Sequence, residues 1–230
     1  MALDNFTQIY SNYDKAVKAF AGSLRYNNRP IVNVFASPER VFNQVEISLN
    51  KQRRKKGIPE ESLTVIPLPV LSVSLVGEAY DMSRSRYATW QVMYTNTDRD
   101  TIYGMQYPQP LTLTYQVDIW TRTKEDLDIL GVQFMQKFTT NFTYLTVDHV
   151  FPMGERLVMV RLSNINIDIA TDTLGEKKVV RKSYTIEVDA WIVPPVLEAG
   201  NIQNIQADIY DITEPDSPVL IDEIVVTDDD

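Results

Sequence analysis

The stretch LTLTYQVDIW, residues 111–120, alternates apolar and polar side chains along its whole length. This period of two is typical of a β-strand with one face packed on a core. The apolar face carries Leu111, Leu113, Tyr115, Val117 and Ile119, and the opposite face carries Thr112, Thr114, Gln116, Asp118 and Trp120. Residues 179–193 repeat the pattern before Pro194 and Pro195 end it. We therefore predict two long strands, each with one apolar face.

Both strands end in the sequence VDxW, which places Trp120 and Trp191 on the faces opposite the apolar ones. Two explanations stay open for these large aromatic side chains. The chain's own helix or arm covers the second face of the sheet, or a neighbouring subunit covers it, because aromatic anchors are enriched at protein interfaces. If the two strands are adjacent, we expect Asp118, Trp120, Asp189 and Trp191 to form one patch.

Three segments have the spacing of amphipathic helices, beginning with residues 1–24. After a predicted strand at 30–36, the sequence SPE (37–39) provides an N-cap, a proline at the first helical position and an acid in the first turn. That helix should bury one face and stop at Gly57. The sequence TKED (123–126) resembles a capping box and starts the third helix. Its predicted apolar stripe consists of Leu127, Leu130, Phe134, Met135 and Phe138.

Further strands and connections complete the expected fold. LSVSLV (71–76) and residues 157–170 alternate as strands, and a turn at 171–178 leads into the return strand. Residues 77–110 are largely polar, which is typical of a functional loop. We predict an α+β fold, with an antiparallel or mixed β-sheet and helices on one face, plus an extended loop and a C-terminal arm.

The expected organisation has three parts. Residues 1–24 form an N-terminal helical segment. Residues 25–196 form an α+β domain that contains the loop excursion 77–110. Residues 197–230 form an acidic, extended arm with one or two β segments.

The composition excludes several classes of protein. The chain has no Cys, so disulfides and thiolate chemistry are ruled out, and a reducing compartment fits. The net charge of −9 argues against nucleic-acid binding by the whole surface. No apolar run approaches the length of a membrane helix, so we expect no membrane partner.

We expect no catalytic site, cofactor or metal. The single histidine, His149, cannot build a histidine-rich metal site and is expected to be structural. Neither HExxH, GxSxG nor a glycine-rich phosphate loop occurs. Asp98 and Asp100 flank Arg99, but without a glycine-spaced ligand loop they are weak evidence for a hard-metal site.

The basic block KQRRKK (51–56) has two interpretations. Cations are favourable at the carbonyl end of a helix, so the block can be a solvated helix end. Alternatively, Arg53, Arg54, Lys55 and Lys56 bind an acidic neighbour.

Several blocks in order resemble one family. PLTLTYQVDIWTRTKEDLDILGVQFMQKF (110–138) and RKSYTIEVDAWIVPPV (181–196) are similar to the tail sheath stabiliser or tail completion (tail terminator) proteins of contractile-tailed bacteriophages. The matching features are a strand ending in Trp120-Thr121-Arg122, an acidic helix start, and a later strand ending in Trp-x-x-Pro-Pro. Residues 31–52 and 64–76 fit in order and spacing, so the resemblance covers about 25–196.

The resemblance implies a structural virion protein at the tail–neck junction, assembled in the host cytoplasm. Such a protein forms a homo-oligomeric ring, usually a hexamer, on the last ring of tail tube protein and ends tube polymerisation. It holds the top of the tail sheath and joins the tail to the head connector or stopper protein. DNA passes through the lumen without specific binding, and an acidic wall would repel its phosphates.

Three interpretations therefore stay open. The first is the ring at the tail–head junction, the second is another ring or adaptor such as a head-completion, stopper or baseplate protein, and the third is a soluble enzyme or general binding module. The absence of a catalytic constellation argues against the third. The candidate protein-interface residues are Asp118, Trp120, Arg122, Asp189, Trp191, Arg53, Arg54, Lys55 and Lys56.

Overall fold

The computed structural model describes residues 2–57, 67–85, 91–95, 101–149, 154–166, 172–174, 177–193, 197–201, 204–211 and 219–227. The chain divides into two units. The first consists of Met1–Ser85 and Pro108–Val193, and the second of Arg86–Tyr107 and Pro194–Asp230. The chain therefore passes between the units three times, after Ser85, before Pro108 and after Val193.

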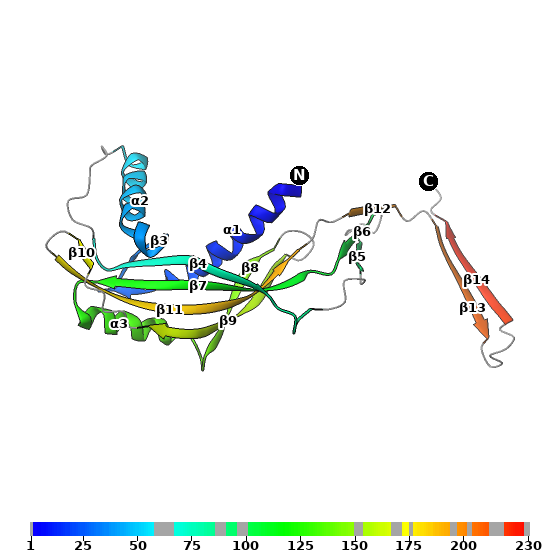
Figure 1. Cartoon of the computed structure of the whole chain (residues 1–230). Coiled ribbons are helices and arrows are strands. Elements are labelled where there is room, and N and C mark those ends of the chain that lie inside the picture. Colours follow the sequence, from blue (N-terminus) through cyan, green and yellow to red (C-terminus); the bar gives the residue numbers. More distant parts are fainter. Residues whose placement is uncertain are drawn as a thin grey trace. The chain divides into compact units, whose positions relative to one another are not determined.

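A seven-stranded mixed sheet forms the centre of the first unit (Figure 1). Its strands, in spatial order, are β3 (Val32–Phe35), β4 (Val70–Tyr80), β7 (Gln109–Thr121), β11 (Lys177–Ile192), β9 (Glu155–Asn166) and β8 (Phe142–Asp148), with β10 (Asp172–Leu174) also paired to β11. Only the β3–β4 pair is parallel among these pairs. A parallel pair needs a crossover connection, which helix α2 (Val41–Lys55) supplies. The predicted α+β class and mixed sheet are confirmed.

The strand predicted at 111–120 lies in the middle of this sheet as β7, between β4 and β11. Leu113, Tyr115, Val117 and Ile119 are at most 1% exposed, as the alternation predicts. The apolar residues of β11 extend this face, because Tyr184 is the register partner of Val117 and Ile186 is that of Tyr115. The apolar faces of the two strands thus form one continuous core surface.

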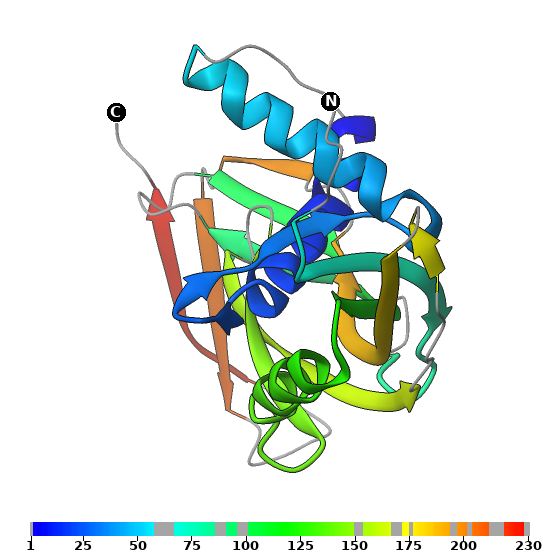
Figure 2. The ribbon, with the colours of Figure 1, turned by 90° about the vertical axis from the view of Figure 1, so that its left-hand side faces the viewer.

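Helices α1 (Ala2–Ala21) and α3 (Lys124–Met135) pack on this apolar face. Helix α1 buries Ile9, Tyr13, Val17 and Ala21. It contacts β3 and β4 as well as β11 and β8, so the sheet curls around it from one edge to the other (Figure 2). Edge-to-face contacts between Phe20 and the rings of Phe134 and Phe138 join α1 to the α3 region.

Helix α3 begins at Thr123, whose Oγ1 accepts a hydrogen bond from the backbone N–H of Asp126 at 3.2 Å. This is the predicted cap. Four residues of the predicted stripe are buried, namely Leu127, Leu130, Phe134 and Phe138. The prediction for Met135 is wrong, since its side chain is 42% exposed. Met135 is the last helical residue and lies one position round from Phe134, on the flank that faces solvent.

Helix α2 covers one end of the opposite face of the sheet, so the helices lie on both faces and not on one face as expected. A 3₁₀ turn, Pro38–Arg40, precedes it, and Ser37 makes no side-chain capping bond. Val41 and Val45 are buried, and Phe42 and Leu49 pack against the same cluster, as predicted for this helix. Gly57 has a φ of +69° and ends the helix as expected.

The second unit contains two further sheets. One has the order β12 (Leu197–Asn201), β6 (Thr101–Gln106) and β5 (Gln91–Thr95). The other is the antiparallel hairpin of β13 (Asn204–Asp211) and β14 (Val219–Thr227). The expected loop excursion 77–110 therefore includes β5 and β6, and the expected arm includes β12, β13 and β14. In the first unit, a small hairpin joins β1 (Arg25–Tyr26) and β2 (Arg29–Pro30) through Asn27 and Asn28, which have the positive φ of a two-residue turn.

Candidate interaction surfaces

Trp120, at the end of β7, is covered by the chain's own helix α2. Its side chain is 1% exposed, and its ring meets that of Phe42 edge to face at a centroid distance of 5.2 Å. The indole N–H donates to Oγ of Ser72 at 3.1 Å. The guanidinium carbon of Arg181 lies 5.2 Å from the ring centroid. The first of the two explanations therefore applies to Trp120, because the β3–α2–β4 crossover lies over this end of the face.

Asp118 also lies inside the chain, with no exposed surface. Its carboxylate accepts hydrogen bonds from Nε2 of Gln116, at 2.9 and 3.1 Å, and from Oγ of Ser183. These donors replace the hydration that a buried carboxylate loses. Arg122 follows β7 as an exposed residue. Among the three candidates near the end of β7, Arg122 is the one that offers surface to a partner.

The two VDxW sequences lie on the same face of the sheet but at opposite ends. Strands β7 and β11 are adjacent and antiparallel, so that Trp120 is opposite Arg181 and Trp191 is opposite Pro110. Ten residues of β11 separate these positions, which corresponds to about 34 Å of strand. The single patch expected from adjacency does not form, because strands that pair antiparallel place their C-terminal ends far apart.

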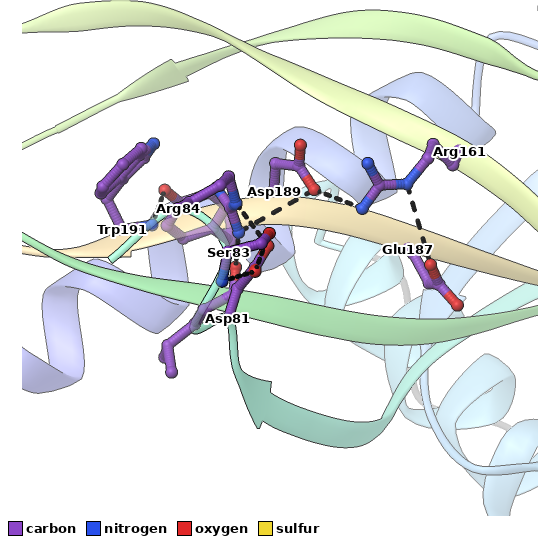
Figure 3. Close-up of polar contacts among 9 residues, drawn as sticks. Asp81, Ser83, Arg84, Arg161, Glu187, Asp189 and Trp191 are labelled. Carbon is purple, nitrogen blue, oxygen red and sulfur yellow. Dashed lines mark hydrogen bonds and ion pairs between the residues drawn. The ribbon is translucent and has the colours of Figure 1, made fainter. Parts of the chain in front are cut away.

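Ion pairs surround Asp189 at the far end of this face (Figure 3). Nη2 of Arg161 donates to Oδ1 of Asp189 at 2.7 Å, and Nε of Arg161 lies 3.8 Å from Oε2 of Glu187. Nη2 of Arg84 lies 3.9 Å from the same oxygen of Asp189. Two guanidinium groups thus face a largely buried carboxylate, and the shorter contact is a charge-assisted hydrogen bond.

Arg84 joins the turn after β4 to the neighbouring strands. Its Nε donates to Oδ2 of Asp81 at 2.6 Å, and its Nη2 donates to the carbonyl of Leu111 at 2.6 Å. Its guanidinium carbon lies 5.1 Å from the ring centroid of Trp191. Hydrogen bonds from Arg84 and then Ser83 hold the pKa of Asp81 well below its ordinary value. Trp191 is therefore partly covered by Arg84 from the same chain.

We call this set the Asp189 cluster; its members are Asp81, Arg84, Arg161, Glu187, Asp189 and Trp191. It lies at the end of the sheet where the chain leaves the first unit. The crossings after Ser85 and after Val193 follow the ends of β4 and β11, and the crossing before Pro108 precedes the start of β7. The cluster thus ties together the three strand ends that lead to the second unit.

An exposed apolar surface continues this face toward the edge strand β8. Phe142 is 40% exposed, Tyr144 is 56% exposed, and Leu157 on β9 is 72% exposed. Phe142 is the register partner of Arg161, which places this surface on the same face as the Asp189 cluster. The rings of Phe142 and Tyr144 meet edge to face at 6.0 Å. Exposed aromatic and aliphatic side chains beside a strand edge are typical of a docking surface.

The basic block forms the last turn of α2 and the residues after it. Lys51, Arg54, Lys55 and Lys56 are exposed, and Arg53 is half-buried. A shallow hollow next to the block is lined by Ile47, Asn50, Lys51 and Arg54. Ile47 is 51% exposed, so this side of α2 combines an apolar side chain with clustered cations.

His149 has a structural environment, as expected. It is 5% exposed, its ring meets that of Tyr13 edge to face at 5.4 Å, and its Nε2 lies 3.4 Å from the hydroxyl of Tyr13. Burial lowers the pKa of His149 below its ordinary value, and the charge of Arg156 lowers it further. Asp98 and Asp100 lie outside the described residues. Elsewhere, among the residues that the structure does describe, no group of three or more His, Cys, Asp or Glu side chains could hold a metal ion.

Sequence reasoning missed Arg84 and Arg161, the two cations of the Asp189 cluster. Arg161 alternates with the buried Val158 and Val160 on β9, so its place opposite Glu187 follows once β9 and β11 are paired. Arg84 lies in a turn within the stretch expected to be a loop, and no local pattern indicates that it reaches β7 and β11.

Comparisons with known proteins give the following findings. The family model described as "T4-like virus Myoviridae tail sheath stabiliser" matches residues 34–229. No curated protein matches the chain. A solved structure, the PVC sheath/tube terminator of an extracellular contractile injection system in its extended state, is similar with a TM-score of 0.40 and 10% sequence identity. The match covers 83% of this chain, which spans 58% of that chain's length. Over the described part of the chain, no helix is both long enough and apolar enough to cross a membrane.

Proposed function

Because the chain belongs to the tail sheath stabiliser family of T4-like viruses, we propose that it forms a ring that caps the tail tube and ends its polymerisation. The same ring holds the top of the contractile sheath and joins the tail to the head connector. The observation that carries this proposal is the match of the family model to residues 34–229, which include parts of both units. Membership indicates a structural component of the tail rather than an enzyme.

Two distinct surfaces of the first unit support a closed ring. A ring of identical subunits uses a head-to-tail interface, in which each subunit contributes two different patches. The exposed apolar surface of Phe142, Tyr144 and Leu157 is one patch, and the basic end of α2 is a second, chemically different one. The edge strand β8, paired only with β9 in the described part of the sheet, suits strand addition by a tube or sheath neighbour.

The test is negative-stain imaging of tail tubes that polymerise with and without this protein. We expect a ring at one tube end and tubes that stop at the length reached when the protein is added. Tubes that carry no ring and grow at the same rate would refute the terminator function. A protein that then binds isolated heads or baseplates instead would be the other adaptor of the same machine.

A matched pair of variants sharpens this test. Tyr144→Ala combined with Leu157→Ala removes exposed apolar area beside the β8 edge. The control, Ile129→Ala combined with Val132→Ala, removes exposed apolar area from α3, where both side chains are just over half exposed. We expect the first variant, and not the control, to lose the ring at the tube end. Equal loss or equal retention would show that this face does not carry the contact.

The acidic composition supports passage of DNA through the lumen of the proposed ring. Where the acidic residues of the chain face the lumen, they would repel the phosphates, so the genome would slide without binding. Substitution of the lumen carboxylates by amides should slow ejection, and an unchanged rate would contradict this part of the proposal.

A further inference from the structure

We propose that the β13–β14 hairpin of one copy docks on the basic end of helix α2 in a neighbouring copy. This inference rests on the ring of the proposed function and names one of its contacts between subunits. The two surfaces involved are the block Lys51–Lys56 with the adjacent hollow, and the acidic strands of the hairpin.

The negative charge of the chain is concentrated in the arm. Residues 197–230 contain ten Asp or Glu and no Lys or Arg, whereas the whole chain contains 31 acidic and 22 basic residues. Residues 1–196 therefore carry 21 acidic and 22 basic residues and are close to neutral. The arm has no cation of its own to neutralise its carboxylates.

The register of the hairpin places two acidic residues opposite each other. Asp208 is paired with Glu223, and the next pair contains Asp222 opposite Ile209. Like charges directly opposite each other destabilise an antiparallel pair. A two-stranded hairpin is only marginally stable in water even without such a pair. Cations from elsewhere would therefore favour the hairpin.

The end of α2 supplies cations at the highest density in the sequence, with five Lys or Arg among residues 51–56. Four of the five are exposed, and the hollow beside them has the half-exposed Ile47 on its wall. Charged and apolar contacts are therefore available together. An acidic β-hairpin with isoleucine residues in both strands, and with valine residues in β14, matches this combination.

A neighbouring copy is the occupant that the ring requires. Within the first unit, α2 lies at the end of the sheet opposite the point where the arm leaves, about 37 Å along β11. A contact within one chain would close on itself and link no subunits. A contact between chains gives each subunit one donor and one acceptor surface, which is the head-to-tail arrangement that closes a ring.

Site-directed cross-linking tests this inference. The chain contains no Cys, so each introduced Cys is the only thiol that can react. Lys51→Cys and Asp222→Cys variants of the whole chain, which carry tags of different size, are mixed and treated with a short bis-maleimide. The reaction is run once on the protein in solution and once on tubes capped with it. We expect a heterodimer that contains both tags, and about tenfold less of it when Arg54 and Lys55 are also changed to Glu. The control, Lys124→Cys on α3 mixed with Asp222→Cys, should give none.

A charge swap separates contact between chains from contact within a chain. The α2 variant Arg54→Glu with Lys55→Glu should cross-link again when mixed with the arm variant Asp208→Lys with Glu223→Lys, because each restores opposite charge across the interface. Cross-links confined to single chains, or to tube or sheath protein, would overturn the proposal. So would binding of the block to duplex DNA that competes with cross-linking.

The two proposals fail in different ways. If wild-type protein gives neither rings nor capped tubes, the proposed function fails. If rings and caps form normally with the α2 and arm variants and no heterodimer appears, the ring stands and the hairpin contact is refuted.

Discussion

Replacing Trp120 by Ala removes the side chain that joins helix α2 to the sheet. The indole packs on Phe42, lies beside Arg181 and donates to Ser72, and its side chain is 1% exposed. If α2 of the same chain covers this residue, the substitution must destabilise the isolated subunit. If a neighbouring subunit covered it, the substitution would change the stability of the isolated subunit very little.

The burial sets the size of the effect. A buried Trp removes about 200 Å² from water, which at about 25 cal/mol per Å² is worth roughly 5 kcal/mol. The Ala that remains keeps part of this area, whereas the lost hydrogen bond to Ser72 adds about 1 kcal/mol. We therefore expect Trp120→Ala to lower the free energy of unfolding by about 3–5 kcal/mol. This is a large share of the roughly 5–15 kcal/mol that stabilises an ordinary domain.

The assay is urea unfolding followed by far-UV circular dichroism, at a concentration where the protein is monomeric. Trp191→Ala is the matched control, because Trp191 ends the other VDxW sequence and is only partly buried beneath Arg84. We expect it to cost about 1–2 kcal/mol. A Trp120→Ala monomer within about 1 kcal/mol of wild type would refute the assignment of Trp120 to the core under α2.

Three further predictions concern the packing and charges of the first unit. Gly131→Ala should lower the free energy of unfolding by about 1–3 kcal/mol, because a Cβ would lie 2.6 Å from Oη of Tyr184. That oxygen is buried with no hydrogen-bond partner among the described residues, so Tyr184→Phe should relieve the cost of Gly131→Ala in a double-mutant cycle. Additive costs of the two substitutions would contradict this. Burial lowers the pKa of His149 below its unfolded value of about 6.5, so the unfolded chain binds more protons below that pH. The contribution of His149 to stability should therefore be complete above about pH 6.5 and fall as the pH drops below it. Thermal melts of His149→Phe should lose this dependence of stability on pH, and an unchanged dependence would assign it to other groups. Asp189→Asn should cost about 1–2 kcal/mol in urea unfolding, because it removes the anion between Arg161 and Arg84, whereas Glu187→Gln, at the longer 3.8 Å contact, should cost less.

Sequence periodicity correctly predicted the helices and strands whose formation depends on residues close together in the chain. The alternation at 111–120 and 179–193 comes from the two-residue repeat of a strand, and both strands are present with the predicted faces. The cap at Thr123 and the stop at Gly57 depend on backbone geometry within a few residues, and both are correct. The exposure of Met135 was missed because the pattern does not show where the last helical turn ends.

The site depends on pairings that no short stretch reveals. Trp120 faces Phe42 because a parallel pair of strands, β3 and β4, forces α2 across that face, and nothing near Trp120 in the sequence indicates this crossover. The repeated VDxW suggested one patch, but only parallel neighbours would bring two such strand ends together. Arg84 joins the cluster through the turn after β4, and its contacts with Leu111 and Asp189 depend on the pairing of β4, β7 and β11.

The three crossings between the units give the molecule a particular mechanical connection. They follow or precede β4, β7 and β11, which are adjacent strands in the interior of the sheet order and not its edge strands β3 and β8. A force applied to the second unit is therefore shared by three strands, because at these ends β7 is hydrogen-bonded to β4 on one side and to β11 on the other. Such a load must shear several ladders together, whereas a single connection at an edge strand would let them peel one bond at a time. The path of the chain thus attaches the second unit to the first through several strand pairs, an arrangement suited to a tail component under a pulling force.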